Sequence, residues 1–249
     1  MLWPPIQELR AFYHTPLGAV VCRHVRNLMH DTWPEVGSGT RLAQPEYVAG
    51  IGFANPYMTP FLGHPDEKDS YHIISLMPAT MGACIWPKGR PNSSLLVQEE
   101  ALPLADASIE RMVLVHALEF VAEPEAFMRE VWRVMRPDGR LIAIAPNRRS
   151  MLARSEETPF GQGRPYSARQ LERLLTNAMF TVEKSCSRLF GFPSQFKLFL
   201  RMNNLIEPIG IKWGGMMGGI LVMEAQKQLY APGLITKKKP SLGLAAASE

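Results

Sequence analysis

The chain has 249 residues, of which 46% are hydrophobic and 20% are charged, and its formal net charge is +4. This length and hydrophobic content allow one large domain with its own core, and two domains of equal size are not expected. The lysines and arginines are scattered among 23 acidic residues rather than gathered in a stripe, so a nucleic-acid-binding protein is not favoured.

Membrane and metal-binding classes are not favoured either. No apolar stretch is long enough to cross a bilayer, and Met1–Pro5 lacks the layout of a signal peptide. Cys22, Cys84 and Cys186 lie far apart and show no metal-ligand spacing, so we predict neither a disulfide framework nor a metal site. We expect a cytoplasmic protein, and the sequence indicates no particular oligomeric state.

The first predicted element is an amphipathic helix. From Leu17 to Met29 the apolar residues recur at the spacing of one helix face, and Pro34 follows soon after. We therefore expect a helix that ends before Pro34, within a helical segment over residues 1–44.

Short apolar runs bounded by glycine, proline or polar residues recur along the rest of the chain. Runs of this length and composition are typical of strands buried in a parallel sheet. The predicted strands are Tyr47–Ile51, Tyr71–Met77, Ser94–Gln98, Ile109–Val115, Arg140–Ala145, Phe180–Leu189 and Gly219–Glu224.

Helical patterns lie between several of these strands. Asn55, followed by Pro56, favours a helix start with Asn55 as the N-cap. A second helix is predicted over Glu125–Met135, before a tight turn at Pro137–Gly139, and a third from Ser167, its N-cap, to Ala178. Strands that alternate with helices predict an α/β protein with a mostly parallel, doubly wound sheet and helices on both faces.

We expect the main domain to span residues 1–232. Residues 192–215 are aromatic and methionine-rich, which indicates an insertion near the open end of the sheet. Residues 233–249 are rich in Pro, Gly, Ala and Ser, which indicates a disordered tail.

Several motifs follow one another in the middle of the chain, each beside a predicted strand. In order they are Leu102-Pro103 with Asp106, His116–Glu119, Arg133–Gly139 and Pro146-Asn147. At these intervals they resemble the second half of the class I S-adenosylmethionine-dependent methyltransferase domain, in its type 11 branch. The resemblance implies a Rossmann-like fold with a seven-stranded sheet, the cofactor S-adenosylmethionine, and methyl transfer to a small-molecule acceptor.

The turn after the first predicted strand departs from the pattern of that family. Gly50 stands where the family has an acid, Gly52 keeps the first of three glycines, and Ala54 and Pro56 replace the other two. The carboxylate that the family uses for the ribose is also missing, because Ser75–Pro78 contains no acid.

The residues that the resemblance places at the cofactor crevice follow the first four strands. They are Gly50, Gly52, Phe53, Met77, Pro78, Glu99, Glu100 and His116. We expect Glu99 or Glu100 to supply the carboxylate near the adenosine. His116 is also a candidate general base, because an imidazole can accept a proton near neutral pH; the alternative is a histidine held by a backbone carbonyl.

Further candidates lie at the mouth of the crevice. The amide of Asn147 can orient an acceptor but cannot act as a base, and Arg148 can hold an anionic group. Tyr13 and Tyr166 complete the predicted substrate-binding set, although packing or solvent-facing roles are alternatives for these residues. We predict that Asn147, which would orient the acceptor, and His116 are the catalytic residues.

Two functions therefore remain open. One is a methyltransferase that binds S-adenosylmethionine through an altered turn. The other is a catalytically inactive methyltransferase-like protein with a regulatory or scaffold role, which the two missing carboxylates favour.

Overall fold

The computed structural model describes residues 3–36, 46–62, 71–150, 152–154, 158–188 and 219–229. Within these ranges seven strands form one sheet in the order β3-β2-β1-β4-β5-β7-β6. The strands are β1 (Glu46–Gly52), β2 (Tyr71–Pro78), β3 (Ser94–Val97), β4 (Ile109–Val115), β5 (Met135–Pro146), β6 (Phe180–Arg188) and β7 (Ile220–Lys227). β7 runs antiparallel to both of its neighbours, and the other pairs are parallel. The predicted α/β class and the mostly parallel seven-stranded sheet are confirmed.

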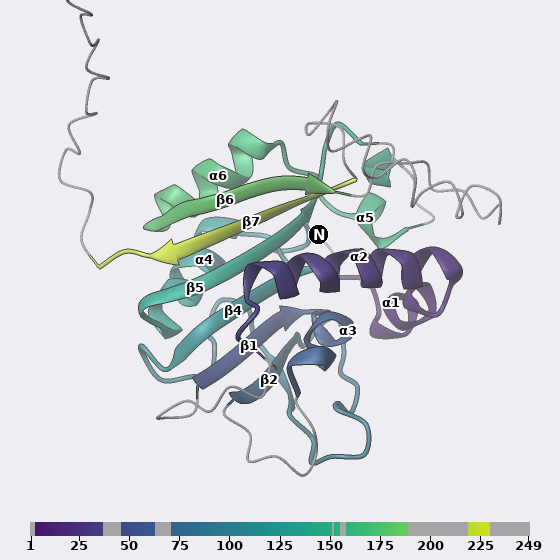
Figure 1. Ribbon diagram of the computed structural model, residues 1–249, viewed down its shortest axis with the longest axis horizontal. Coiled ribbons are helices and arrows are strands. Elements are labelled where there is room, and N and C mark those ends of the chain that lie inside the picture. The colour runs from purple at the N-terminus through teal and green to yellow at the C-terminus, as the bar shows by residue number, and fades with distance from the viewer. Residues whose placement is uncertain are drawn as a thin grey trace, which may run out of the picture.

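Helices cover both faces of this sheet. They are α1 (Ile6–Tyr13), α2 (Pro16–Thr32), α3 (Asn55–Met58), α4 (Pro124–Val134), α5 (Pro159–Gln162) and α6 (Ala168–Asn177), with short 3-10 turns at Thr59–Leu62 and Leu152–Arg154. Figure 1 shows α2 in front of the sheet and α4 and α6 behind it. In the same view α1, α3 and α5 gather at one end of the sheet, beside the carboxyl ends of the central strands.

The core consists of two layers, one on each face of the sheet. Along β4, Met112 and Leu114 belong to the layer with α4 and α6, whereas Val113 and Val115 belong to the layer with α2. Side chains of a strand alternate between faces, and here both faces are buried. This burial explains why the strands read as continuous apolar runs in the sequence.

Two local predictions need correction. β5 begins at Met135 rather than at Arg140, and the predicted turn at Pro137–Gly139 lies inside the strand as an irregularity in its pairing with β4. The N-cap of α3 is Ala54, and Asn55 is instead the first helical residue. The side chain of Asn55 is buried and bonds Ser75 of β2, which explains why it does not cap the helix. The predicted insertion at 192–215 and the tail at 233–249 lie outside the described residues.

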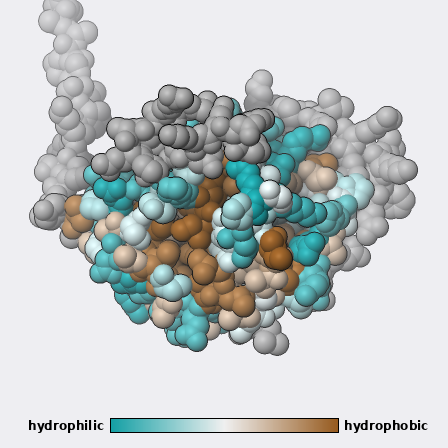
Figure 2. Space-filling view, turned by 90° about the horizontal axis from the view of Figure 1, so that it is seen from below, coloured by the Kyte–Doolittle hydropathy of each residue, from teal (hydrophilic) through white to brown (hydrophobic). Residues whose placement is uncertain are grey.

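The edge formed by β3 carries apolar side chains on the surface. Leu95 and Leu96 are 46% and 55% exposed, and Ile85 in the preceding loop is 78% exposed. Figure 2 shows the molecule from below the view of Figure 1, and apolar side chains gather over the middle of the surface on this side. The backbone N–H and carbonyl oxygen of Ser94 are both hydrogen-bonded to the Asn92 side chain. The Asn92 amide accepts from the N–H and donates to the carbonyl oxygen, each at 3.2 Å.

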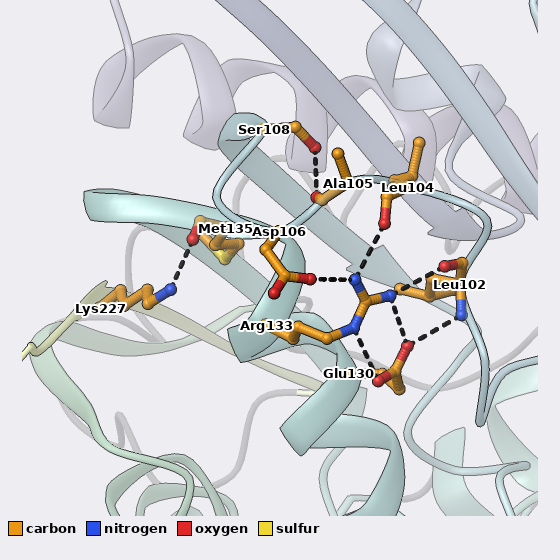
Figure 3. A network of polar contacts seen from close by, with 9 residues as sticks. All are labelled: Leu102, Leu104, Ala105, Asp106, Ser108, Glu130, Arg133, Met135 and Lys227. Carbon is orange, nitrogen blue, oxygen red and sulfur yellow. Dashed lines mark hydrogen bonds and ion pairs between the residues drawn. The ribbon is translucent and has the colours of Figure 1, made fainter.

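Arg133 joins α4 to the loop before β4 (Figure 3). Its guanidinium donates to the Glu130 carboxylate at 2.8 and 2.9 Å, to Asp106 at 2.6 Å, and to the carbonyl oxygens of Leu102 and Leu104, each at 2.9 Å. Glu130 also accepts from the Leu102 N–H at 3.0 Å. The motif residues Leu102, Asp106 and Arg133 therefore form one structural unit with Glu130.

None of the helices in the described ranges has both the length and the apolar character that a membrane span requires. Over the same ranges, His, Cys, Asp and Glu side chains form no group of three or more with the geometry of a metal site.

Candidate active site

The order of the strands places a topological switch point between β1 and β4. β1 has β2 on one side and β4 on the other, so the chain connections leave this point in opposite directions. In open α/β sheets, ligands bind at the carboxyl ends of the strands at such a switch point. Here the two strands end at Gly52 and Val115, which are paired, and the Phe53 N–H donates to the Val115 carbonyl oxygen at 2.9 Å.

The close approach of β1 and β4 explains Gly52 without any ligand. Its φ is +85°, a left-handed conformation that favours glycine. A Cβ atom at this position would overlap the Val115 carbonyl oxygen and lie 2.6 Å from that of His116. Gly50, where the family has an acid, faces the Met58 side chain and Ala54, which fill the space that a larger side chain would need.

His116 lies at the centre of a buried chain of polar side chains. Its ring is 1% exposed, and its Nδ1 is 3.2 Å from Oε1 of Glu119. On the other side, Nε2 is 2.7 Å from the Tyr13 hydroxyl, which also bonds the Tyr57 hydroxyl. Oε2 of Glu119 is buried and has no hydrogen-bond partner among the described residues.

One set of hydrogen-bond directions is consistent with these partners. If Nδ1 of His116 carries the ring proton, it donates to the Glu119 carboxylate, Nε2 accepts from the Tyr13 hydroxyl, and Tyr13 accepts from Tyr57. In that tautomer Nε2 has the lone pair that a base needs, but Tyr13 occupies it.

Aromatic rings surround this chain. The His116 ring lies 4.7 Å from that of Phe160, and the Tyr13 ring lies 5.6 Å from that of Phe53. Burial is the main cause that raises the pKa of Tyr13, and likewise the pKa of Tyr57, well above the ordinary value for a phenol. Both tyrosines are therefore neutral at physiological pH and act as hydrogen-bonding groups rather than as phenolates.

α1 and the residues before it cover the carboxyl edge of the sheet. The Trp3 indole N–H donates to Glu99 at 3.1 Å, and its ring lies 5.8 Å from that of Phe120. The Ile6 N–H donates to the Met81 carbonyl oxygen at 3.0 Å, just beyond β2. Trp3, Ile6 and Leu9 belong to the same buried layer as Phe53 and Met77, which are 3% and 0% exposed.

The remaining predicted residues fall into two places. Pro78 is buried at the end of β2, and Glu100 is exposed after β3. At the end of β5, Asn147 is buried, with its amide oxygen accepting from the Arg149 N–H at 3.1 Å, and Arg148 is exposed.

Tyr166 links the end of β5 to the turn after β4. Its hydroxyl donates to the Leu118 carbonyl oxygen at 3.0 Å, and its N–H donates to the Pro146 carbonyl oxygen at 2.9 Å. Burial is the first cause that raises the pKa of Tyr166 to about 12, with the nearby Glu119 as the second. The structure thus brings Tyr13, Phe53 and His116 together and places Asn147 and Arg148 on the far side of Tyr166.

Comparisons with known proteins agree with this architecture. A family model described as a methyltransferase domain matches residues 79–143. A "Probable S-adenosylmethionine-dependent methyltransferase" of Mycolicibacterium smegmatis is 33% identical over 92 residues, which are 36% of this chain and 35% of that protein. The chain therefore aligns with about a third of the length of this curated relative.

Solved structures match over more of the chain. A Thermotoga maritima S-adenosylmethionine-dependent methyltransferase, described as a possible histamine N-methyltransferase, superposes with a TM-score of 0.56 at 21% identity and covers 90% of this chain and 96% of its own. The YcgJ protein of Bacillus subtilis superposes with a TM-score of 0.51 at 14% identity and covers 83% of this chain and 99% of its own. Residues 79–143 thus match a methyltransferase family, and the chain shares the fold of these solved structures.

S-adenosylmethionine is the cofactor that these matches indicate, and the segment that includes α1 packs against residues predicted to contact it. The predicted contacts Phe53, Met77 and His116 are buried under α1, and Met58 fills the space beside Gly50. Cavities of about 360, 680 and 330 Å³ lie in other parts of the fold. At Gly50, Phe53, Met77 and His116 the described side chains are packed against one another or against α1 and α3.

Sequence reasoning did not include three residues that the structure places at the site. Trp3 and Tyr57 come from segments far from His116 in the sequence, and Phe160 comes from α5. The sequence analysis names Glu119 only as the end of the motif His116–Glu119 and predicts no role for it. Its spacing of three residues from His116 is a local signal that the two side chains can meet.

Proposed function

We propose that the protein is an S-adenosylmethionine-dependent methyltransferase that acts on a small-molecule acceptor. The observation that carries the proposal is the meeting of β1 and β4 at the switch point, where the Gly52 turn lies beside the buried pair of His116 and Glu119. The methyltransferase match over residues 79–143 and the similarity to an S-adenosylmethionine-dependent relative support the cofactor. The acceptor belongs to the small-molecule class because the sequence contains no basic stripe that would hold a nucleic acid.

The residues proposed for the cofactor follow the carboxyl ends of β1, β2, β3 and β4. They are Gly50, Gly52, Phe53, Met77, Pro78, Glu99, Glu100 and His116. When bound, the cofactor supplies a methyl group on a sulfonium, and holding the acceptor in line supplies most of the rate.

The chain itself supplies a place for the proton of the acceptor. Nε2 of His116 carries the lone pair, and an imidazolium formed there faces the Glu119 carboxylate across 3.2 Å. We assign Asn147 to orienting the acceptor and Tyr13, Arg148 and Tyr166 to contacts with it. Tyr13 must release Nε2 before His116 can act as a base.

The alternative is a catalytically inactive relative with a regulatory or scaffold role. Two observations favour it: the family's carboxylates are absent from Gly50 and from Ser75–Pro78, and α1 packs into the crevice. A relative that has lost the cofactor would have no need to expose this edge of the sheet.

Calorimetric titration of the protein with S-adenosylmethionine and with S-adenosylhomocysteine distinguishes the two functions. For the enzyme we expect micromolar binding of both, with ATP as a control nucleotide that does not bind. S-adenosylhomocysteine at a hundred times its Kd should also raise the free energy of unfolding by about 2.7 kcal/mol. A folded sample that binds neither ligand would support the inactive relative.

A further inference from the structure

α1 lies across the end of the sheet and contacts both layers of the core. Trp3, Ile6 and Leu9, before and within this helix, belong to the layer with α4 and α6, whereas Phe12 belongs to the layer with α2. The helix therefore closes the carboxyl edge instead of covering one face. Figure 1 shows it beside α3 at that end of the sheet.

Polar contacts hold both ends of this covering segment. At its start the Trp3 indole donates to Glu99, and at its end the Tyr13 hydroxyl is hydrogen-bonded to Nε2 of His116. Glu99 and His116 are both residues that we assign to the cofactor. The covering segment therefore uses the same polar groups that an adenosyl ligand would need.

α2 begins directly after the end of α1. Thr15 caps α2, because its Oγ1 accepts from the Gly18 N–H at 3.1 Å, and Pro16 occupies the first position of that helix. The start of α2 is thus stabilised by its own residues. The end of α1 rests against Gly18, where a Cβ atom would overlap the Phe12 carbonyl oxygen and lie 2.7 Å from Cα of Tyr13.

We propose that the segment Trp3–Tyr13 is an internal competitor of the cofactor. In the docked state it fills the crevice between β1, β2 and β4, and it must move away at the joint before Thr15 to admit an adenosyl ligand. The inference rests on the proposed function. The apparent affinity of the ligand is then reduced by the fraction of molecules in which the segment is undocked.

Tyr13→Phe tests this competition in the full chain. The variant keeps the ring but removes the bonds to His116 and Tyr57, so it weakens the docked state alone. We expect calorimetry to show S-adenosylhomocysteine binding about tenfold tighter than to the wild type. Tyr71→Phe is the matched control, because the Tyr71 hydroxyl donates to the Glu35 carbonyl oxygen, at the opposite end of β2, and its loss should leave binding unchanged.

Gly18→Ala tests the same idea without touching the crevice. Alanine favours the interior of α2, but its Cβ forces the backbone of Phe12 and Tyr13 away from that helix. We expect binding of S-adenosylhomocysteine to tighten in this variant as well. Circular dichroism and urea unfolding of both variants establish that the samples are folded.

Hydrogen exchange of the wild type distinguishes a segment that competes with the ligand from one that closes over it. Ligand binding should speed exchange of the α1 amides in the first case and slow it in the second. If the segment competes, S-adenosylhomocysteine at saturation should speed exchange of the α1 amides, from Leu9 to Tyr13, by about tenfold or more. Slower exchange there, together with weaker binding by Tyr13→Phe, would overturn the competitor and leave the methyltransferase proposal standing. Failure of the wild type and of both folded variants to bind would overturn both proposals.

Discussion

At residue 52 the requirement for glycine has two physical parts. The φ of +85° is strained for any residue with a Cβ atom, and the paired end of β4 occupies the space where that atom would lie. Gly89 has a similar φ of +74°, but nothing lies within 4 Å of its Cβ position. A substitution at Gly89 therefore tests conformational strain alone, whereas one at Gly52 tests strain together with steric overlap.

We expect Gly89→Ala to lower the free energy of unfolding by about 1–2 kcal/mol, the cost of the left-handed conformation alone. Gly52→Ala adds overlap with backbone atoms of β4, and a loss of about 3–5 kcal/mol is expected. Urea unfolding of the two variants measures the difference. Equal losses would contradict the steric part of the explanation.

The buried tyrosines predict how stability changes at alkaline pH. Burial raises the pKa of Tyr13 and Tyr57 well above the ordinary value, and raises the pKa of Tyr166 to about 12. Above pH of about 10 the unfolded chain releases phenolic protons that the folded protein keeps, so this contribution to stability is complete below that pH and is lost as the pH rises.

Ultraviolet absorbance of the phenolate should therefore show late ionisation of part of the six tyrosines, coincident with loss of structure. Urea unfolding at pH of about 9 and about 11 should give a smaller free energy at the higher pH. Tyr57→Phe should remove one of the late ionisations. Full ionisation of all phenols in a protein that stays folded would show that Tyr13 and Tyr57 are accessible.

Among the elements, α4 depends on the network of Arg133 and Glu130. Hydrogen bonds from Arg133 are the main cause that holds the pKa of Glu130 below its ordinary range. A carboxylate with a lowered pKa contributes stability above the pKa of the unfolded chain, about 4.3, and this contribution is lost as the pH falls through the folded pKa.

We expect Glu130→Gln to lower the free energy of unfolding by about 1–3 kcal/mol at neutral pH, since it weakens hydrogen bonds between charged groups. The difference from the wild type should shrink as the pH falls below the pKa of the unfolded chain, about 4.3, and through the lowered pKa of folded Glu130. Urea unfolding across this range is the measurement. Glu100→Gln is the matched control, because Glu100 is exposed and no contact connects it to α4 in the described network. If the two free energies of unfolding differed by the same amount at every pH, the ionisation of Glu130 would not contribute to stability.

The sequence predicted the strands and several helices closely, and it missed α1 as a separate element. Strands buried on both faces leave continuous apolar runs, and Ser167 and Gln170 form the capping box at the start of α6, where Ser167 was the predicted N-cap. The buried positions of the first segment are Trp3, Ile6, Leu9 and Phe12, spaced by three and divided between two core layers. That spacing departs from the single stripe of an ordinary surface helix.

The chain of hydrogen bonds at His116 was only partly predictable for a related reason. His116 and Glu119 are three residues apart, whereas Tyr13 and Tyr57 approach His116 from elements that are distant in the sequence. Their meeting depends on how α1 and α3 pack against the end of the sheet. Periodicity and motifs carry no information on that packing.

For the whole molecule, the resemblance to methyltransferases predicts the sheet but not the side chains that pack against its carboxyl edge. The family model matches residues 79–143, whereas those side chains come from residues 3–13 and from Met58, outside that match. The fold is therefore the part of the molecule that the matching motifs predict, and the packing of α1 is not.

Asn92 bears on how this protein behaves when many copies are crowded together. An unpaired strand at the border of a sheet can recruit a strand from a neighbouring molecule and start aggregation. Here β3 is short, and Asn92 already satisfies the N–H and carbonyl oxygen of Ser94. A single amide side chain thus removes one hydrogen-bonding position through which a strand of another copy could pair with this border.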